Sequence, residues 1–256
     1  MIHPTAIVLP GAEIGRDVEI GPYAVIGPNV TIGHGTRIGA SAVIDGWTVI
    51  GENNQIFHLS SVGAVPQDLK YRGEETYLKI GNGNIVREFA TIHLGTVTGD
   101  GETTIGDNNL FMAYCHVAHD CHIGNHVVMA NGATLAGHIT VEDYARLGGL
   151  SAIHQFVRIG AHVMIGGGAM VGQDVPPYTI AAGDRATLHG LNLVGLKRAG
   201  FSEEVLVQLK KAYKILIRSG LLTDEALQRI RTEIPQSPQL DHFVEFVAKS
   251  ERGICR

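Results

Sequence analysis

A six-residue repeat runs through most of this chain and constrains its fold more than any other feature. One apolar residue recurs at every sixth position, and a glycine often follows it, as in Ile14-Gly15 and Ile20-Gly21. Neither an α-helix, with 3.6 residues per turn, nor an ordinary strand, with a period of two, produces this spacing. The repeated positions are Ile2, Val8, Ile14, Ile20, Ile26, Ile32, Ile38, Ile44, Ile50, Ile56, Val62, Ile80, Val86, Ile92, Ile105, Phe111, Val117, Ile123, Met129, Leu135, Val141, Leu147, Ile153, Ile159, Ile165 and Val171.

This period is typical of a chain that coils in triangular turns, with one short strand and one corner in each hexad. The apolar residue then points inward, and the glycine lets the backbone turn at the corner. Three hexads complete a coil, so residues eighteen apart stack with a spacing of about 4.8 Å. The pattern resembles the bacterial transferase hexapeptide repeat, whose fold is a left-handed parallel β-helix. We therefore predict an all-β left-handed parallel β-helix over residues 1–188.

Two interruptions break the repeat, at residues 64–79 and at about 94–104. We predict that both are loops that leave the coil. Because Val62 and Ile80 are eighteen residues apart, we expect the first loop to replace one whole turn. Loops on a rigid scaffold often carry function, so both are candidates for the walls of a site.

Beyond Gln173–Tyr178 the apolar spacing becomes helical, which predicts a small C-terminal α-helical domain over residues 189–256. Ser202 is the expected N-cap of a first helix, which Gly220 ends. Thr223 is the expected N-cap of a second helix, and Ser237-Pro238 the start of a third.

Charge is distributed unevenly along the chain. Residues 1–194 carry 9 basic and 17 acidic side chains, whereas residues 195–256 carry 11 basic and 8 acidic ones. A basic tail on an acidic body suggests an anionic partner, although an ordinary solvated helix surface gives the same balance.

Several classes of protein are disfavoured by the composition. The three cysteines are an odd number without a CxxC spacing, so we expect no disulfide framework. No run of eighteen apolar residues is present, and Met1-Ile2-His3-Pro4 does not begin a signal peptide, so we expect a soluble cytoplasmic protein without a membrane span. We expect no nucleic-acid partner.

Histidines are concentrated in one part of the repeat, which favours a functional site over a solvated surface. Seven of the thirteen fall between residues 116 and 162. His119 stacks on Gly137, eighteen residues later, and a glycine there leaves its backbone N–H uncovered. A general base beside an N–H donor for an oxyanion is what acyl transfer to a hydroxyl needs. Asp120 is a candidate for orienting the imidazole, although adjacent residues point in different directions.

Zinc binding is the competing interpretation of these histidines. Some trimeric β-helices of this type hold a metal with three histidines from neighbouring chains. His116, His119 and His122 are spaced three apart, so they point around the coil and could share one ion only across an interface between chains. A zinc enzyme of the γ-carbonic-anhydrase kind predicts stoichiometric zinc and leaves the helical tail without an evident use.

Seven sequence blocks resemble the acyl-[acyl-carrier-protein]–UDP-N-acetylglucosamine O-acyltransferase family, which opens lipid A synthesis in Gram-negative bacteria. They occur in the family's order along nearly the whole chain, including the helical tail. A related N-acyltransferase family carries an additional N-terminal uridine-binding domain, whereas here the repeats begin at Ile2. The blocks are Asp-Leu-Lys-Tyr (68–71), His-Val-Ala-His-Asp-Cys (116–121), Thr-Leu-Ala-Gly-His (134–138), Ile-His-Gln-Phe (153–156), Gly-Ala-His-Val-Met (160–164), Gln-Asp-Val-Pro-Pro-Tyr (173–178) and Gly-Leu-Lys-Arg-Ala-Gly-Phe (195–201).

The resemblance implies a direct transfer that needs neither a metal nor a cofactor. An (R)-3-hydroxyacyl group would move from acyl carrier protein to the 3-hydroxyl of UDP-N-acetylglucosamine, with His119 as general base and the Gly137 N–H as oxyanion donor. The family acts as a homotrimer with each site between two subunits, and the basic tail would meet the acidic carrier protein. The residues implied to contact the sugar nucleotide are Asp68, Lys70, His116, His138, His154, Gln155, Asn192 and Arg198.

The chain departs from the family pattern in the tail. Ala199 stands where the second arginine of a pair is usual, and Val194 where an acidic residue is common, so we expect altered affinity for the nucleotide or the carrier. Gly167 matches the position that measures the acyl chain in this family. A glycine leaves that groove open, which predicts a longer acyl chain.

Overall fold

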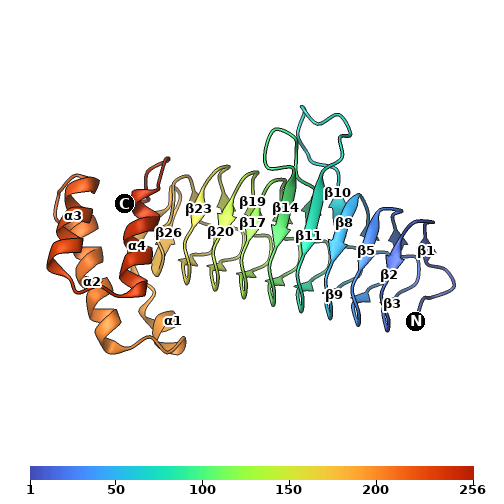
Figure 1. Ribbon diagram of the computed structural model, residues 1–256, viewed down its shortest axis with the longest axis horizontal. Helices are drawn as coiled ribbons and strands as arrows, with labels where there is room; N and C mark the ends of the chain where they lie inside the picture. Colours follow the sequence, from blue (N-terminus) through green and yellow to red (C-terminus); the bar gives the residue numbers. More distant parts are fainter.

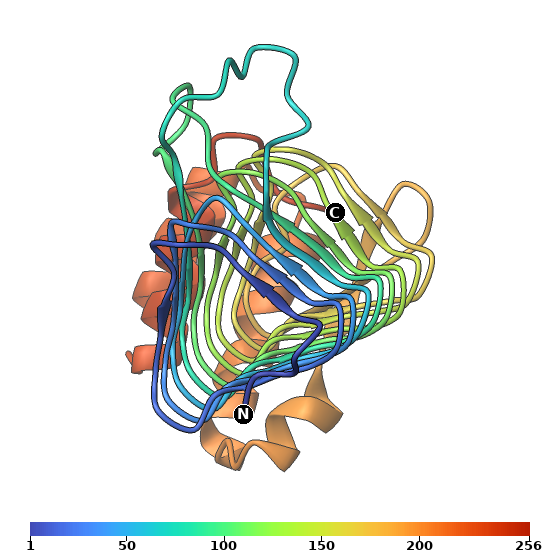
Figure 2. The same ribbon diagram turned by 90° about the vertical axis from the view of Figure 1, so that its right-hand side faces the viewer.

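The computed structural model describes residues 1–256 and consists of a long three-sided prism followed by a group of helices (Figure 1). Viewed along its axis, the prism is a stack of triangular coils (Figure 2). Each complete coil contributes one short strand to each of three sheets, which form the three faces of the prism and are parallel except where the last strand, β27, pairs antiparallel with β26.

From β1 to β25 the strands are assigned to the three faces in strict rotation, and β26 and β27 then both join the third face. The first face contains β1 (Ile7–Val8), β4 (Val25–Ile26), β7 (Val43–Ile44), β10 (Ser61–Ala64), β13 (Thr91–His93), β16 (His116–Val117), β19 (Thr134–Leu135), β22 (Ala152–Ile153) and β25 (Met170–Val171). The second face contains β2 (Glu13–Ile14), β5 (Val30–Ile32), β8 (Trp47–Ile50), β11 (Tyr77–Ile80), β14 (Glu102–Ile105), β17 (His122–Ile123), β20 (Thr140–Val141) and β23 (Arg158–Ile159). The third face contains β3 (Glu19–Ile20), β6 (Arg37–Ile38), β9 (Gln55–Ile56), β12 (Ile85–Val86), β15 (Leu110–Phe111), β18 (Val128–Met129), β21 (Arg146–Leu147), β24 (Met164–Ile165), β26 (Thr179–Ala182) and β27 (Thr187–Leu191).

Strand register confirms the predicted stacking of residues eighteen apart. Val25 pairs with Val43 on the first face, and His116 pairs with Thr134 further along it. The repeated apolar residues point inward, and most belong to one continuous core of 43 buried residues that runs along the prism. Burial of this apolar column along the whole axis is the main stabilising contribution to the coil.

Both predicted loops leave the prism, from the same corner. Residues 65–76 follow β10 and residues 94–101 follow β13, so the loops emerge between the first and second faces in successive coils and protrude together (Figures 1 and 2). The expectation that the first loop replaces a whole turn is wrong. Ile80 pairs with Ile50, the preceding residue of the ladder on the second face, so the loop is an insertion at a corner of an otherwise continuous coil.

A helical region follows the prism and has a core of its own. The helices are α1 (Leu193–Arg198), α2 (Glu203–Arg218), α3 (Thr223–Glu233) and α4 (Pro238–Ala248). They enclose 17 buried residues, among them Leu209 and Phe243. The predicted boundary at 188/189 falls within β27, and the independence of the two parts as domains stays a prediction.

Sequence signals located the starts of two of the four helices. Ser202 and Ser237 are the N-caps of α2 and α4, as predicted, and accept hydrogen bonds from Val205 N and Leu240 N. Thr223 is not a cap, because α3 begins at that residue and its N-cap is Leu222. The short helix α1 was not predicted.

Two expectations from composition can be compared with the structure. All three cysteines are free and buried. None of the helices combines the length and the apolar composition that a membrane span requires.

Candidate active site

His119 lies at the corner between the first and second faces, directly after β16. The two protruding loops leave this same corner in the two preceding coils, on the N-terminal side of the histidine. Its side chain is 15% exposed, so the imidazole is largely buried but still accessible to solvent.

Gly137 lies one coil further along the same corner and is packed against the imidazole. A Cβ atom at position 137 would lie 2.6 Å from Cε1 and 2.8 Å from Nε2 of His119, so only glycine fits there without displacing the ring. The Gly137 N–H donates to no acceptor within the chain, whereas its carbonyl accepts from Phe156 N. The predicted juxtaposition of an imidazole and a free backbone donor is therefore present.

Asp120 fixes the orientation of the imidazole. Its Oδ2 lies 2.7 Å from Nδ1 of His119, although the two residues are adjacent in the chain. The contact is possible because Asp120 occupies the left-handed region, with φ of 57°, which turns its side chain back towards its neighbour. With an ionised Asp120, the His119 proton resides on Nδ1 and Nε2 is left as a proton acceptor.

A buried network holds the Asp120 carboxylate in place. Its side chain is 1% exposed. Thr96 donates from its backbone N to Oδ1 at 2.9 Å and from its hydroxyl to Oδ2 at 2.6 Å, and Thr103 accepts from Asp120 N. Burial raises the pKa of Asp120, but hydrogen bonds from His119 and Thr96 outweigh that effect and hold the pKa below its usual value. Neither threonine was singled out by sequence, because both belong to the second interruption, whose exit corner the period does not reveal.

His138 is the second imidazole at this corner. Its ring stacks on Phe156 with centroids 4.5 Å apart and meets the His119 ring edge-on at 5.0 Å. Burial lowers the pKa of His138, while the negative charges of Asp120, Asp100 and Asp68 oppose that effect. His138 is therefore mainly neutral near pH 7.

A second pair of histidines lies on the first face beside this corner. His93 is 3% exposed and meets His116 edge-on, with centroids 4.9 Å apart. Burial lowers the pKa of His93 to about 4, and the neighbouring histidines add to that effect. Burial also lowers the pKa of His116, whose Nδ1 lies 2.7 Å from the Thr91 hydroxyl. His93 was missed because it directly follows a repeated apolar position, where most residues of this chain are structural.

The remaining residues of the predicted site are divided between this corner and other parts of the molecule. Asp68 and Lys70 lie on the first loop, where Asp68 Oδ1 accepts from Lys70 N, and the Asp68 charge acts on His138. His154 and Gln155 are exposed beyond β22, two coils after His119.

Asn192 and Arg198 do not lie near His119 within one chain. Asn192 is the N-cap of α1, where its Oδ1 accepts from Gly195 N, and its Nδ2 donates to the carbonyl of His162 at 2.9 Å. His162 lies at the corner between the second and third faces, so α1 is at a different corner from the two loops (Figure 1). Gly167 lies at the remaining corner, between β24 and β25.

Comparison with known proteins resolves the family. A profile described as "Udp N-acetylglucosamine O-acyltransferase; Domain 2" matches residues 174–255, and the six-repeat bacterial transferase hexapeptide profile matches residues 11–46 and 102–137. An acyl-[acyl-carrier-protein]–UDP-N-acetylglucosamine O-acyltransferase from Thermodesulfovibrio yellowstonii is 58% identical over 255 residues, which cover 100% of this chain and 99% of the relative. The chain belongs to this O-acyltransferase family.

Solved structures of the O-acyltransferase family agree over the full length. LpxA from Acinetobacter baumannii superposes with a TM-score of 0.98 at 46% identity, covering 100% of this chain and 99% of that one. UDP-N-acetylglucosamine acyltransferase from Campylobacter jejuni gives a TM-score of 0.94 at 40% identity, covering 100% and 99%. These matches confirm the predicted left-handed parallel β-helix and the predicted family, and they do not favour the zinc-enzyme alternative.

The side chains that could together bind a metal ion in this fold are not the three histidines considered in the sequence analysis. His116, His119 and His122 point around the prism, and His122 Nε2 pairs instead with Asp100 at 2.9 Å. The side-chain nitrogen and oxygen atoms that do converge belong to His119, Asp120 and His138, all within 4.8 Å of one another.

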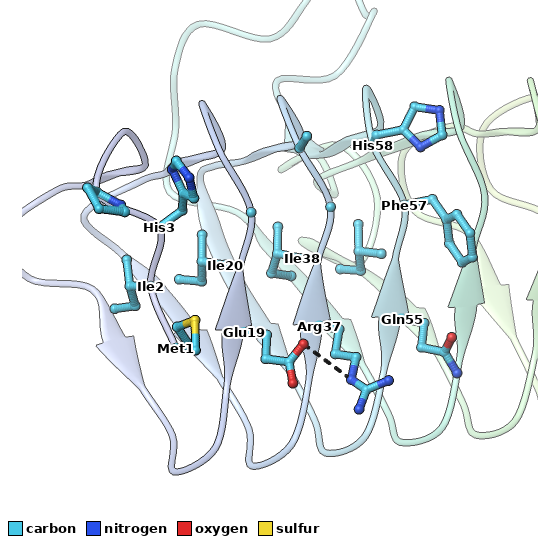
Figure 3. A pocket seen from close by; sticks show the side chains of 15 residues that line it. Met1, Ile2, His3, Glu19, Ile20, Arg37, Ile38, Gln55, Phe57 and His58 are labelled. Carbon is cyan, nitrogen blue, oxygen red and sulfur yellow. Dashed lines mark ion pairs between the residues drawn. The ribbon is translucent and has the colours of Figure 1, made fainter.

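A cavity elsewhere on this family member does not resemble a catalytic site. It measures about 710 Å³ and lies at the N-terminal end of the prism (Figure 3). Its charged side chains, Glu19 and Arg37, pair with each other at 3.6 Å, and Ile20 and Ile38 contribute apolar surface. Nothing there matches the ordered base and free N–H at His119 and Gly137.

Proposed function

We propose that this chain transfers an (R)-3-hydroxyacyl group from acyl carrier protein to the 3-hydroxyl of UDP-N-acetylglucosamine, the first step of lipid A biosynthesis. The names of its relatives support an O-acyl transfer between acyl carrier protein and UDP-N-acetylglucosamine, as for the relative from Trichlorobacter lovleyi, which is 60% identical over 258 residues. The observation that carries the proposal is the His119 imidazole, oriented by buried Asp120 and packed against the free N–H of Gly137.

The chemistry follows from that geometry. Nε2 of His119 removes the proton from the sugar hydroxyl as its oxygen attacks the thioester carbonyl. The Gly137 N–H donates to the oxyanion that develops on this carbonyl, and the fixed donor needs no reorganisation during the reaction. Collapse of the tetrahedral intermediate breaks the carbon–sulfur bond, and the imidazolium returns its proton to the departing thiolate. Asp120 stabilises the imidazolium during this interval.

The other polar residues of the proposed site would bind the substrate. Asp68 and Lys70 on the first loop, and His116 and His138 beside His119, would contact the sugar and its phosphates. His154 and Gln155 would extend the site towards the helices. Neutral histidines suit this role, because they donate to and accept from sugar hydroxyls without a charge of their own.

The proposed site is completed by a second subunit. Asn192 and Arg198 lie at another corner of the prism, so they would hold the nucleotide bound beside a neighbouring chain, with Arg198 contacting phosphate. A homotrimer would contain three such sites, each between two neighbouring chains. The corner between the third and first faces supports this assembly, because it exposes a row of large apolar side chains, a common feature of interfaces. These are Tyr23, Leu59, Phe89, Tyr114 and Leu150.

The carrier protein would meet the helical tail. Helix α2 exposes four cations, and acyl carrier protein is the acidic partner that the resemblance implies, so their charges are complementary. These cations are Lys210, Lys211, Lys214 and Arg218. With these substrates, the expected location is the cytoplasm.

One assay tests the proposal. Purified full-length protein is treated with a chelator and incubated with radiolabelled UDP-N-acetylglucosamine and hydroxyacyl carriers of several lengths. Label should move into an acylated product without added metal, and light scattering should give the mass of three chains. Absence of transfer with every donor, or transfer that requires zinc, overturns the proposal.

A further inference from the structure

We infer that His119, Asp120 and His138 form an inhibitory site for a divalent transition-metal ion, for which Zn²⁺ is the natural probe. The ion would not take part in the reaction, and it would compete with the catalytic state of His119. The inhibitory consequence rests on the proposed function, whereas the binding site itself does not.

The three ligand atoms are already close to the spacing that zinc requires. Asp120 Oδ2 lies 2.7 Å from His119 Nδ1 and 3.7 Å from His138 Nδ1, and the whole group lies within 4.8 Å. Zinc bonds of about 2.0–2.2 Å to nitrogen and oxygen place tetrahedral ligands a little over 3 Å apart. A shift of His138 towards His119 therefore completes a three-ligand face, with the fourth position open to water.

The surroundings of the ligands are ordered in the way that metal ligands usually are. Two hydrogen bonds from Thr96 fix the Asp120 carboxylate, and the Phe156 ring fixes the plane of His138 by stacking on it. Such supporting contacts orient ligands and strengthen metal binding. Here they exist in the free protein, so little rearrangement is needed.

The local charge also favours a cation. Asp120 is 1% exposed, and the nearby charges of Asp100 and Asp68, one on each loop, act on His138. Three carboxylates around two imidazoles attract a divalent ion to this corner. The donor set of two imidazole nitrogens and one carboxylate suits Zn²⁺, whereas Mg²⁺ prefers oxygen ligands and retained water.

A bound metal ion would prevent His119 from acting as the general base. Coordination at Nδ1 of His119 replaces the hydrogen bond to Asp120 and leaves the single remaining proton on Nε2. That nitrogen is the one packed beside Gly137, and a protonated Nε2 cannot accept the proton of the sugar hydroxyl. The cysteines would not divert the ion, since Cys115 and Cys121 are buried and donate to backbone carbonyls.

Calorimetric titration of the metal-free full-length protein with ZnCl₂ tests binding without any assay of activity. We expect one ion per chain, and an affinity reduced about 10-fold or more in His138→Gln. The matched control is His126→Gln, which removes a histidine that stacks on Tyr144 at a different corner and should leave the affinity unchanged. Equal loss in both variants, or in neither, would reveal an adventitious ion only and overturn the site.

Activity then separates the two proposals. Zn²⁺ should inhibit acyl transfer by the wild-type enzyme over the same concentration range in which it binds, Mg²⁺ should not, and excess EDTA should restore the rate. Specific zinc binding without inhibition would overturn the inhibitory role and leave the site intact. Failure of acyl transfer in the metal-free protein would refute the proposed function while the titration still reports on the site.

Discussion

Gly137 and His119 occupy successive coils of one corner, and the imidazole fills the space that a side chain at 137 would need. The hypothetical Cβ lies 2.6 Å from Cε1 and 2.8 Å from Nε2 of the ring. This close approach leaves the Gly137 backbone beside Nε2, the atom that we propose as the base. Position and reactivity of the imidazole therefore depend on the absence of one methyl group.

Gly137→Ala should abolish most acyl transfer while leaving the prism folded. The added methyl displaces the His119 ring from both Asp120 and the reacting hydroxyl, and a misplaced base or donor costs about 100-fold or more in rate. Steady-state kinetics give the rate, and circular dichroism with thermal unfolding gives the folded state. Gly172→Ala is the matched control, since a Cβ there meets no atom within 4 Å, and it should behave like the wild type. Full activity of Gly137→Ala would remove Gly137 from the mechanism.

Asp120→Asn should lower kcat far more than it changes KM for the sugar nucleotide. An amide can donate to His119 Nδ1, which favours the tautomer with its proton on Nε2, and it cannot stabilise the imidazolium. We expect a loss comparable to that of His119→Ala, about 10²–10⁴-fold, because base catalysis contributes in that range. The control is Asp100→Asn, which removes a carboxylate that is 75% exposed and pairs with His122 rather than His119. A loss confined to KM would assign Asp120 to substrate binding instead.

The period of six made the coil and the stacking of His119 on Gly137 predictable. One residue in every hexad points inward and must be apolar, so the repeat predicts that residues such as Ile20 and Leu135 are buried. Asp120 was a candidate for orienting the His119 imidazole, but the sequence could not establish the contact, because it depends on the positive φ at residue 120. Thr96 reaches Asp120 from the second loop, whose path the repeat does not predict. For the first loop, the spacing of Val62 and Ile80 did not distinguish an insertion from the replacement of a whole turn.

The sequence could not locate the proposed nucleotide-binding residues relative to His119, for a different reason. Asn192 and Arg198 were assigned by resemblance alone, and one chain places them at a different corner from His119. Local sequence determines the N-cap that Asn192 provides for α1, whereas its proximity to a substrate depends on how chains assemble. Neither periodicity nor helix signals contain that information.

His93 should make the folded state sensitive to mild acid. Burial lowers its pKa to about 4 in the folded protein, against about 6.5 when unfolded, so the unfolded chain binds more protons between these values. Stability is therefore greatest above pH 6.5 and falls as the pH drops towards 4, by about 2 kcal/mol between pH 7 and 5 from this group.

Urea unfolding of the wild type and of His93→Gln at both pH values, at one protein concentration, measures this effect. The variant should lose less stability on acidification, whatever its stability at pH 7. The comparable variant His126→Gln, which removes a histidine that stacks on Tyr144, should keep the wild-type dependence. An unchanged pH dependence in His93→Gln would show that His93 does not titrate as proposed.

Gly167→Met should shift the preferred donor towards shorter acyl chains. Gly167 is exposed at the corner between the third and first faces, and a Cβ there meets only the Gly149 carbonyl at 3.4 Å, so a side chain is tolerated and projects outward. The first face separates this corner from His119, and three coils, roughly 14 Å, separate them along the axis. An acyl chain that crosses the first face from His119 would end near Gly167, where a methionine blocks its last carbons. The ratio of kcat/KM for short and long hydroxyacyl carriers measures this shift in preference. Gly167→Ala should give a smaller shift in the same direction. An unchanged ratio in both variants would place the end of the acyl chain elsewhere.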